Sequence, residues 1–81
     1  MIKVFFFARI RELIGVKSIN ILEKHENISS LILALSQKGV FWKIALNSNT
    51  LLVAVNHTLV SLNHPLNSGD EVAFFPPVTG G

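Results

Sequence analysis

The sequence predicts an α+β fold in which one mixed sheet of about five strands has one main helix packed on one face. Short segments with the alternation or the β-branched and aromatic content of strands stand near both ends of the chain. A segment with the apolar spacing of a helix stands between them. The 81 residues provide one domain, and a hydrophobic content of 49% supplies the core that so small a domain needs.

The first quarter of the chain predicts two strands joined by a short helix. Residues 2–8 are rich in β-branched and aromatic side chains. Alternation divides this strand into a core face with Ile2, Val4, Phe6 and Ala8 and a wetter face with Lys3, Phe5 and Phe7. Residues 9–14 are expected to form a helical turn that ends at Gly15, and residues 17–22 alternate again as a second strand.

The main helix is expected to follow Asn27, whose side chain can cap it. Its apolar positions are spaced i, i+3, i+4 and i+7, and they are Ile28, Leu31, Ile32 and Leu35. Gly39 fits the residue just past the end of this helix. Residues 41–46 indicate a second short helical segment, in which Trp42 is interpreted as a packing residue.

The second half of the chain predicts three further strands. Residues 51–55 form a continuous apolar run, which is typical of a central strand. A tight turn at residues 56–58 leads into a short strand at residues 59–60. Turn residues that include Gly69 then precede the last strand, residues 71–75.

A tail is expected to follow the last strand. Pro76 and Pro77 lack amide donors and cannot continue a central strand, so the domain should end at residue 75. Residues 76–81 should then form a flexible C-terminal tail that ends in two glycines, with a reach of about 20 Å at most when extended.

This order of elements resembles the plan of a ubiquitin-like β-grasp fold, and the resemblance implies that the first and last strands are parallel neighbours in the middle of the sheet. If the helix covers the face that carries Phe6 and Phe74, the opposite face is uncovered. That face would hold Phe5, Phe7, Ala73 and Phe75, with Leu59 as a candidate to join them. An apolar patch of a few hundred Å² usually marks a partner site. The alternative is a second covering layer, for which only residues 41–46 are available.

The composition argues against an independent catalytic or metal site. The chain has no cysteine, which excludes disulfides, thiolate metal sites and a cysteine nucleophile. His25, His57 and His64 are too widely spaced for a recognisable metal site and are interpreted as surface residues. Asp70 and Glu71 are adjacent, so their side chains should diverge on a strand rather than form an acid/base pair.

Charge and hydropathy also exclude other classes of partner. The seven basic residues are scattered, and no phosphate-binding glycine loop is present, so we expect no nucleic acid or nucleotide bound to this chain. The first apolar run is too short for a signal peptide or a membrane span. We therefore expect no association with a membrane, and we expect the protein in the cytoplasm.

Several runs of residues carry a family resemblance that extends over the whole length. They are Met1-Ile2-Lys3-Val4, Phe7-Ala8, Arg11-Glu12-Leu13, Val53-Ala54-Val55-Asn56 and the closing run from Gly69 to Gly81, Gly-Asp-Glu-Val-Ala-Phe-Phe-Pro-Pro-Val-Thr-Gly-Gly. With these motifs the chain resembles the small subunits of molybdopterin synthase, which are ubiquitin-like sulfur carriers. Related carriers for thiazole synthesis are typically shorter and lack the Phe-Phe-Pro-Pro run.

The resemblance implies that sulfur is carried on the C-terminal carboxylate as a thiocarboxylate. An adenylyltransferase similar to ubiquitin-activating enzymes would use ATP to adenylate the terminus. The large subunit, in a heterotetramer of two small and two large subunits, would then use the thiocarboxylate to convert cyclic pyranopterin monophosphate into the dithiolene of molybdopterin, in molybdenum cofactor biosynthesis. This chain would bind no cofactor and no metal, and it would be an enzyme only as a subunit.

The resemblance also implies roles for individual residues. Gly81 would be the adenylated and sulfurated end, and Gly80 would give clearance in the partner's channel. Phe7, Leu59 and Phe75 match partner-binding positions, and Arg11 matches a position that can pair with acidic groups on the activating enzyme. Phe5 is added to the partner-binding set by strand alternation alone.

Two alternative functions stay open at this point. One is a sulfur carrier for thiazole and thiamine synthesis. The other is a non-catalytic ubiquitin-like interaction or modifier module that uses only the apolar patch or joins Gly81 to lysines.

Overall fold

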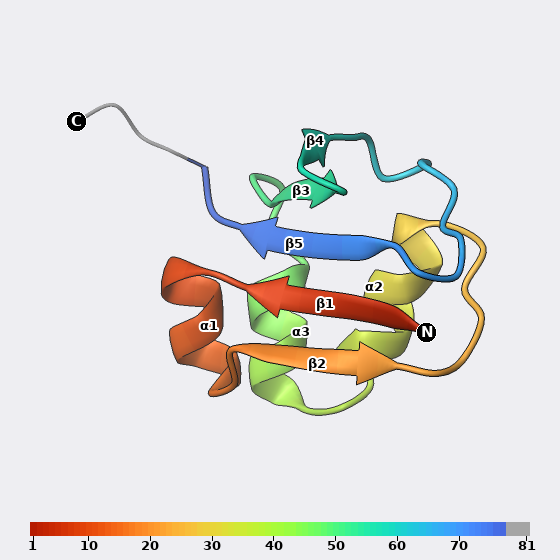
Figure 1. Ribbon diagram of the computed structural model, residues 1–81. Helices are drawn as coiled ribbons and strands as arrows, with labels where there is room; N and C mark the ends of the chain where they lie inside the picture. Colours follow the sequence, from red (N-terminus) through yellow and green to blue (C-terminus); the bar gives the residue numbers. More distant parts are fainter. Residues whose placement is uncertain (78–81) are drawn as a thin grey trace.

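The computed structural model describes residues 1–77 of the chain. Its elements in chain order are β1 (Ile2–Phe6), α1 (Ala8–Ile14), β2 (Ser18–Ile21), α2 (Ile28–Ser36), α3 (Val40–Leu46), β3 (Leu52–Val55), β4 (Thr58–Leu59) and β5 (Glu71–Phe75). Figure 1 shows the strands as one layer, with α2 and α3 behind it and α1 at one end.

The strands form a five-stranded mixed sheet in the order β2-β1-β5-β3-β4. The parallel pair, β1 and β5, lies inside the sheet, with Val4 opposite Val72 and Phe6 opposite Phe74. The pairs β1 with β2, β3 with β5 and β3 with β4 are antiparallel. The first and last strands are therefore neighbours, as predicted, and the fold is a ubiquitin-like β-grasp.

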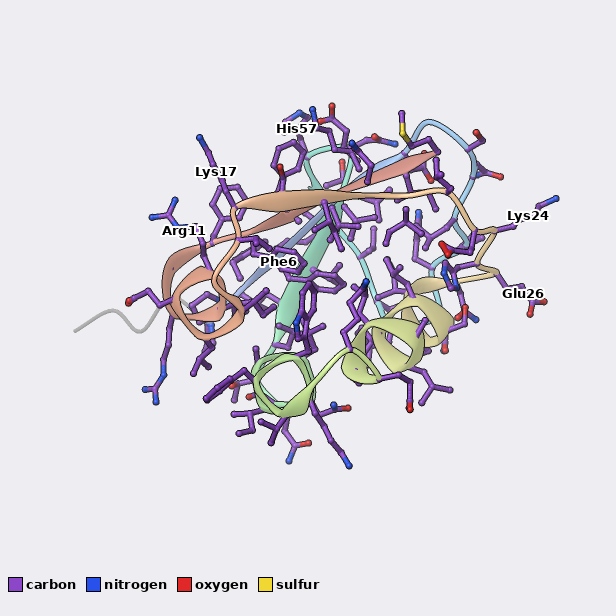
Figure 2. The ribbon with its side chains drawn as sticks, turned by 90° about the horizontal axis from the view of Figure 1, so that it is seen from below. Phe6, Arg11, Lys17, Lys24, Glu26 and His57 are labelled. Carbon is purple, nitrogen blue, oxygen red and sulfur yellow. The ribbon has the colours of Figure 1, made fainter. Side chains whose placement is uncertain are left out.

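Alternation along the strands determines which side chains enter the core. Ile2, Val4 and Phe6 of β1 are buried together with Val72 and Phe74 of β5. The rings of Phe6 and Phe74 stack with centroids 6.2 Å apart, and the rings of Phe6 and Trp42 meet in a T-shaped arrangement with centroids 5.5 Å apart. Figure 2 shows Phe6 between the sheet and the helices, so the interpretation of Trp42 as a packing residue is confirmed.

The main helix, α2, contributes four apolar side chains to the core beneath the sheet. Its buried residues are the four of the predicted spacing, Ile28, Leu31, Ile32 and Leu35. The Asn27 side chain accepts a hydrogen bond from the Ser30 amide at 2.9 Å, and the Ser30 hydroxyl accepts one from the Asn27 amide at 3.2 Å. The predicted cap is therefore confirmed, as half of a reciprocal capping box.

Replacing Asn27 by alanine should lower the free energy of unfolding by about 1 kcal/mol, because the Ser30 amide loses its acceptor at the start of α2. Urea unfolding followed by circular dichroism measures this change. Asn63→Ala, at an exposed loop position, is the matched control and should leave the free energy of unfolding nearly unchanged. Equal effects of the two substitutions would contradict the assigned role of the capping box.

Gly39 does not occupy the position expected of it. α2 ends at Ser36, and the amides of Gln37 and Lys38 close it by donating to Ala34 and Leu35 carbonyls. Gly39 instead precedes α3, and its φ of 164° is extended backbone that any residue adopts. Its position is better explained by the short connection between the two helices than by a C-terminal glycine cap.

The assignment of Ala8 to the core face of the first strand is wrong. β1 ends at Phe6, and Ala8 is exposed, with a φ of 52° at the start of α1. The Phe7 amide donates to the Phe74 carbonyl at 3.1 Å, and the Ile10 amide then donates to the Phe7 carbonyl at 3.2 Å, so the chain turns away from the sheet here. α1 ends at Gly15, with a φ of 88°, as predicted.

Residues 41–46 belong to the helical layer and do not cover the other face of the sheet. α3 packs beside α1 and α2, and its Ala45 and Leu46 are buried. Within residues 1–77, the helices therefore lie on one side of the sheet and leave the opposite side uncovered. None of the helices in this part of the chain is long and apolar enough to cross a bilayer.

Candidate functional site

The uncovered side of the sheet carries an apolar surface that we call the open face. Its residues alternate along the chain with those that enter the core. They are Phe5, Phe7, Ala54, Leu59, Ala73 and Phe75. In the register of the sheet, Phe5 and Ala54 both lie opposite Ala73, and Leu59 lies opposite Ala54. These side chains therefore form one continuous surface across β1, β5, β3 and β4.

A groove of about 350 Å³ runs through the open face. Ala54 and Ala73, the small side chains at its floor, lie opposite each other, whereas the rings of Phe5, Phe7 and Phe75 form its walls. The contrast in size between alanine and phenylalanine on neighbouring strands explains the hollow. Its apolar lining suits apolar side chains of a protein partner.

The aromatic side chains of this groove are arranged as a group. The rings of Phe5 and Phe7 stack with centroids 6.5 Å apart, and the Lys3 ammonium lies 5.6 Å from the centroid of the Phe5 ring. Phe7 is 47% exposed and Leu59 is 63% exposed, whereas Phe5 and Phe75 are half-buried. The structure thus brings Phe5, Phe7 and Phe75 together and places Leu59 beside them, while their partner-binding roles stay predictions.

His57 and Glu71 form one rim of the groove, and the sequence did not identify them as part of it. Asn56 and His57 have φ of 50° and 70°, which is the geometry of a two-residue hairpin turn between β3 and β4. The turn places His57 Nε2 3.9 Å from Glu71 Oε1, with side chains 90% and 50% exposed, so the pair contributes little to stability. The register of the hairpin determines this part of the groove, because it places a residue of the β3–β4 turn beside the last strand.

Asp70 and Glu71 have separate structural surroundings, as predicted. The Asp70 carboxylate accepts hydrogen bonds from Asn56 Nδ2 at 3.0 Å and from the Asn67 amide at 2.8 Å. The Glu71 amide donates to Asn56 Oδ1 at 3.0 Å. These bonds attach the start of β5 to the β3–β4 turn and so set the position of the open face.

Arg11 lies apart from this groove. It is exposed on α1, and Figure 2 shows it with Lys17 at one end of the molecule, whereas Lys24 and Glu26 lie at the opposite end. The predicted site is therefore divided between the open face and the end of the molecule that carries α1.

The chain leaves β5 at this same end, where the Phe7 amide bonds the Phe74 carbonyl next to the start of α1. Pro76 is half-buried and Pro77 is exposed, and they are the only residues of the predicted tail that the structure describes. Gly80 and Gly81 lie outside the described residues. Among residues 1–77, no three His, Cys, Asp or Glu side chains gather in a way that could hold a metal ion.

Comparison with known proteins gives a family and close relatives. The model of the ThiS family matches residues 4–81. The molybdopterin synthase sulfur carrier subunit of Escherichia coli strain K12 is 49% identical over 81 residues and aligns over 100% of both chains. A chain from the complex of subunits 1 and 2 of molybdopterin-converting factor from Helicobacter pylori superposes with a TM-score of 0.68 at 29% identity, over 99% of this chain and 97% of that chain.

A more distant structural relative shares the fold alone. The small archaeal modifier protein 1 of Methanosarcina acetivorans superposes with a TM-score of 0.82 at 23% identity, over 99% of this chain and 95% of that chain. This likeness supports the β-grasp architecture and carries no statement about activity.

Proposed function

The chain belongs to the ThiS family, and from this premise we propose that it is the sulfur carrier subunit of a molybdopterin synthase. The observation that carries the proposal is the position of the open face. β5, which supplies Ala73 and Phe75 to that face, continues directly through Pro76 and Pro77 into the Val-Thr-Gly-Gly terminus. Full-length identity of 49% with the Escherichia coli sulfur carrier supports the same function.

The chemistry begins at the carboxylate of Gly81. A carboxylate resists nucleophilic attack, so a partner adenylyltransferase uses ATP to form an acyl-adenylate, whose adenylate is a good leaving group. A sulfide equivalent from a delivery protein attacks the acyl carbon, AMP leaves, and the terminus becomes a thiocarboxylate. In the large subunit this sulfur is transferred to cyclic pyranopterin monophosphate, and two loaded carriers supply the two sulfurs of the dithiolene.

In this proposal the chain presents its C-terminus to its partners, and the catalytic pockets belong to those partners. Docking of the open face brings the terminus to each partner in turn, and Gly80, with no Cβ, passes through a narrow channel. Arg11 adds an exposed ion pair with the activating enzyme, worth about 0–1 kcal/mol. The partners in this proposal are the adenylyltransferase and the large subunit, in a heterotetramer of two copies of each synthase subunit. ATP is bound by the activating enzyme.

The two alternative functions have weaker support. A carrier for thiazole synthesis is less consistent with the full-length match, because it is expected to be shorter and to lack the run from Phe74 to Pro77. A protein modifier is supported by likenesses at 22% to 24% identity to small archaeal modifier proteins, and those likenesses carry the fold alone.

Mass spectrometry of the intact chain tests the proposal. When the chain is co-expressed with its activating enzyme and a sulfur source, we expect a mass increase equal to the exchange of one oxygen for one sulfur. Fragmentation should confine that increase to Gly81, because only the terminal carboxylate is activated. The same expression without the activating enzyme is the control. If the sulfur-bearing species never forms with all components present, the carrier function is wrong.

A further inference from the structure

A second groove, which we call the tail-root groove, lies where the chain leaves β5 on the helical side of the sheet. It has a volume of about 310 Å³. Three distant segments supply its lining, namely α1, the end of α3 with the loop that follows it, and the start of the tail. The residues that matter here are Arg9, Leu13, Ile44, Leu51, Pro76 and Pro77.

The tail-root groove combines an apolar wall with one cation. Leu13, Leu51 and Pro76 are half-buried, whereas Ile44 is 57% exposed on α3. Arg9 is exposed at the edge of the groove. Among residues 1–77, the one side-chain ion pair within 4.0 Å is that of His57 with Glu71, so in this part of the chain Arg9 has no anionic partner.

We propose that the protein that accepts the C-terminal tail also inserts an apolar side chain into the tail-root groove, beside an acidic group that pairs with Arg9. The proposal rests on the proposed function, because it takes the tail acceptor to be the synthase large subunit. In this arrangement the acceptor contacts the chain on both sides of its exit from β5. The open face forms one wall of the docking surface, and the tail-root groove forms the other.

The reach of the tail carries this inference. Pro77 lines the groove, and the four residues after it span about 14 Å at most when extended. A pocket that holds Gly81 must therefore open within that distance of Pro77. Because Phe75 lies in the open face and Pro76 lies in the tail-root groove, the rim of such a pocket is adjacent to both surfaces.

The size of the open face supports the same conclusion. The largest apolar patch on a single protein commonly covers about 300–600 Å², whereas a stable interface buries about 800 Å² on each partner. The remaining area has to come from the tail and from the surface around its exit. The tail-root groove is continuous with both through Pro76 and Pro77.

Two serine substitutions on α3 provide a matched test. Ile44 is 57% exposed and lines the groove, whereas Val40 is 65% exposed on the same helix and does not line it. Ile44→Ser should weaken the affinity of the full chain for the large subunit, measured by calorimetry, by about fivefold. Val40→Ser should leave the affinity within about twofold of the unsubstituted chain.

A charge substitution tests the acidic group of the acceptor. Arg9→Gln should weaken binding about threefold at low salt, and the difference should shrink at high salt because the pair is exposed. Lys24→Gln is the control, since Lys24 is exposed at the opposite end of the molecule (Figure 2). Thermal unfolding of every variant establishes that each is folded.

The outcomes separate this inference from the proposed function. If the unsubstituted chain does not bind the large subunit, both are wrong. If it binds and Ile44→Ser and Arg9→Gln keep its affinity, only the second wall of the docking surface is wrong. If Ile44→Ser alters self-association in sedimentation experiments but not binding to the large subunit, the groove accepts a second copy of this chain and the inference is overturned.

Discussion

Deletion of Gly81 is expected to abolish sulfur transfer while the chain keeps most of its affinity for the large subunit. The deletion moves the terminal carboxylate back by about 3.5 Å, the length of one extended residue. A displacement of 1 Å can already cost about 100-fold in rate, so the reacting group would lie outside any productive geometry. Affinity should change little, because it comes chiefly from buried apolar side chains near the centre of the interface.

Two measurements on the same variant test this division of roles. Thiocarboxylate formation is followed by mass spectrometry, and binding to the large subunit is followed by calorimetry. Leu33→Ala, at a 66% exposed position on α2, keeps the terminus intact and should retain both properties. A Gly81 deletion that loses binding as completely as sulfur transfer would show that the terminus itself holds the complex together.

Local sequence patterns were sufficient to predict which side chains lie on each face of the sheet. The alternation of Val4, Phe5 and Phe6 assigned core and open positions correctly, because successive side chains of a strand point to opposite faces. The same rule failed at Ala8, which begins a helix with a φ of 52°. The alanine itself gives no indication that the strand ends before it. The parallel pairing of β1 with β5 came from the family resemblance, because alternation does not identify the neighbouring strand.

The candidate site was predictable to the extent that it follows from single strands. Phe5 and Phe75 were assigned to the open face because each lies at an alternate position of its own strand, and Phe7 continues the alternation of Phe5 one residue past the end of β1. His57 was missed as a rim residue because its place depends on the register of a hairpin. The tail-root groove was missed because its lining joins α1, α3 and Pro76, which only the folded chain brings together.

Phe75→Ala is expected to weaken binding to the large subunit about 30-fold, which corresponds to about 2 kcal/mol. Phe75 forms a wall of the open-face groove and is the last residue of β5 before the tail. Its ring therefore lies where the docking surface meets the entrance for the terminus, and centrally placed aromatic side chains contribute most to interfaces. Calorimetry with the full-length variant measures the change, and sulfur loading by the activating enzyme at saturating concentration should still occur.

A matched pair of leucines separates loss of docking from general damage. Leu59 on the open face is 63% exposed, and Leu33 on the helical side is 66% exposed. Truncation to alanine removes the same atoms at both positions, so both variants should have similar stability. Leu59→Ala should weaken binding about fivefold, whereas Leu33→Ala should leave it unchanged, since only Leu59 adjoins the groove. Unchanged affinity in both Phe75→Ala and Leu59→Ala would mean that the partner does not dock on the open face, and the terminus would then have to be presented from another surface.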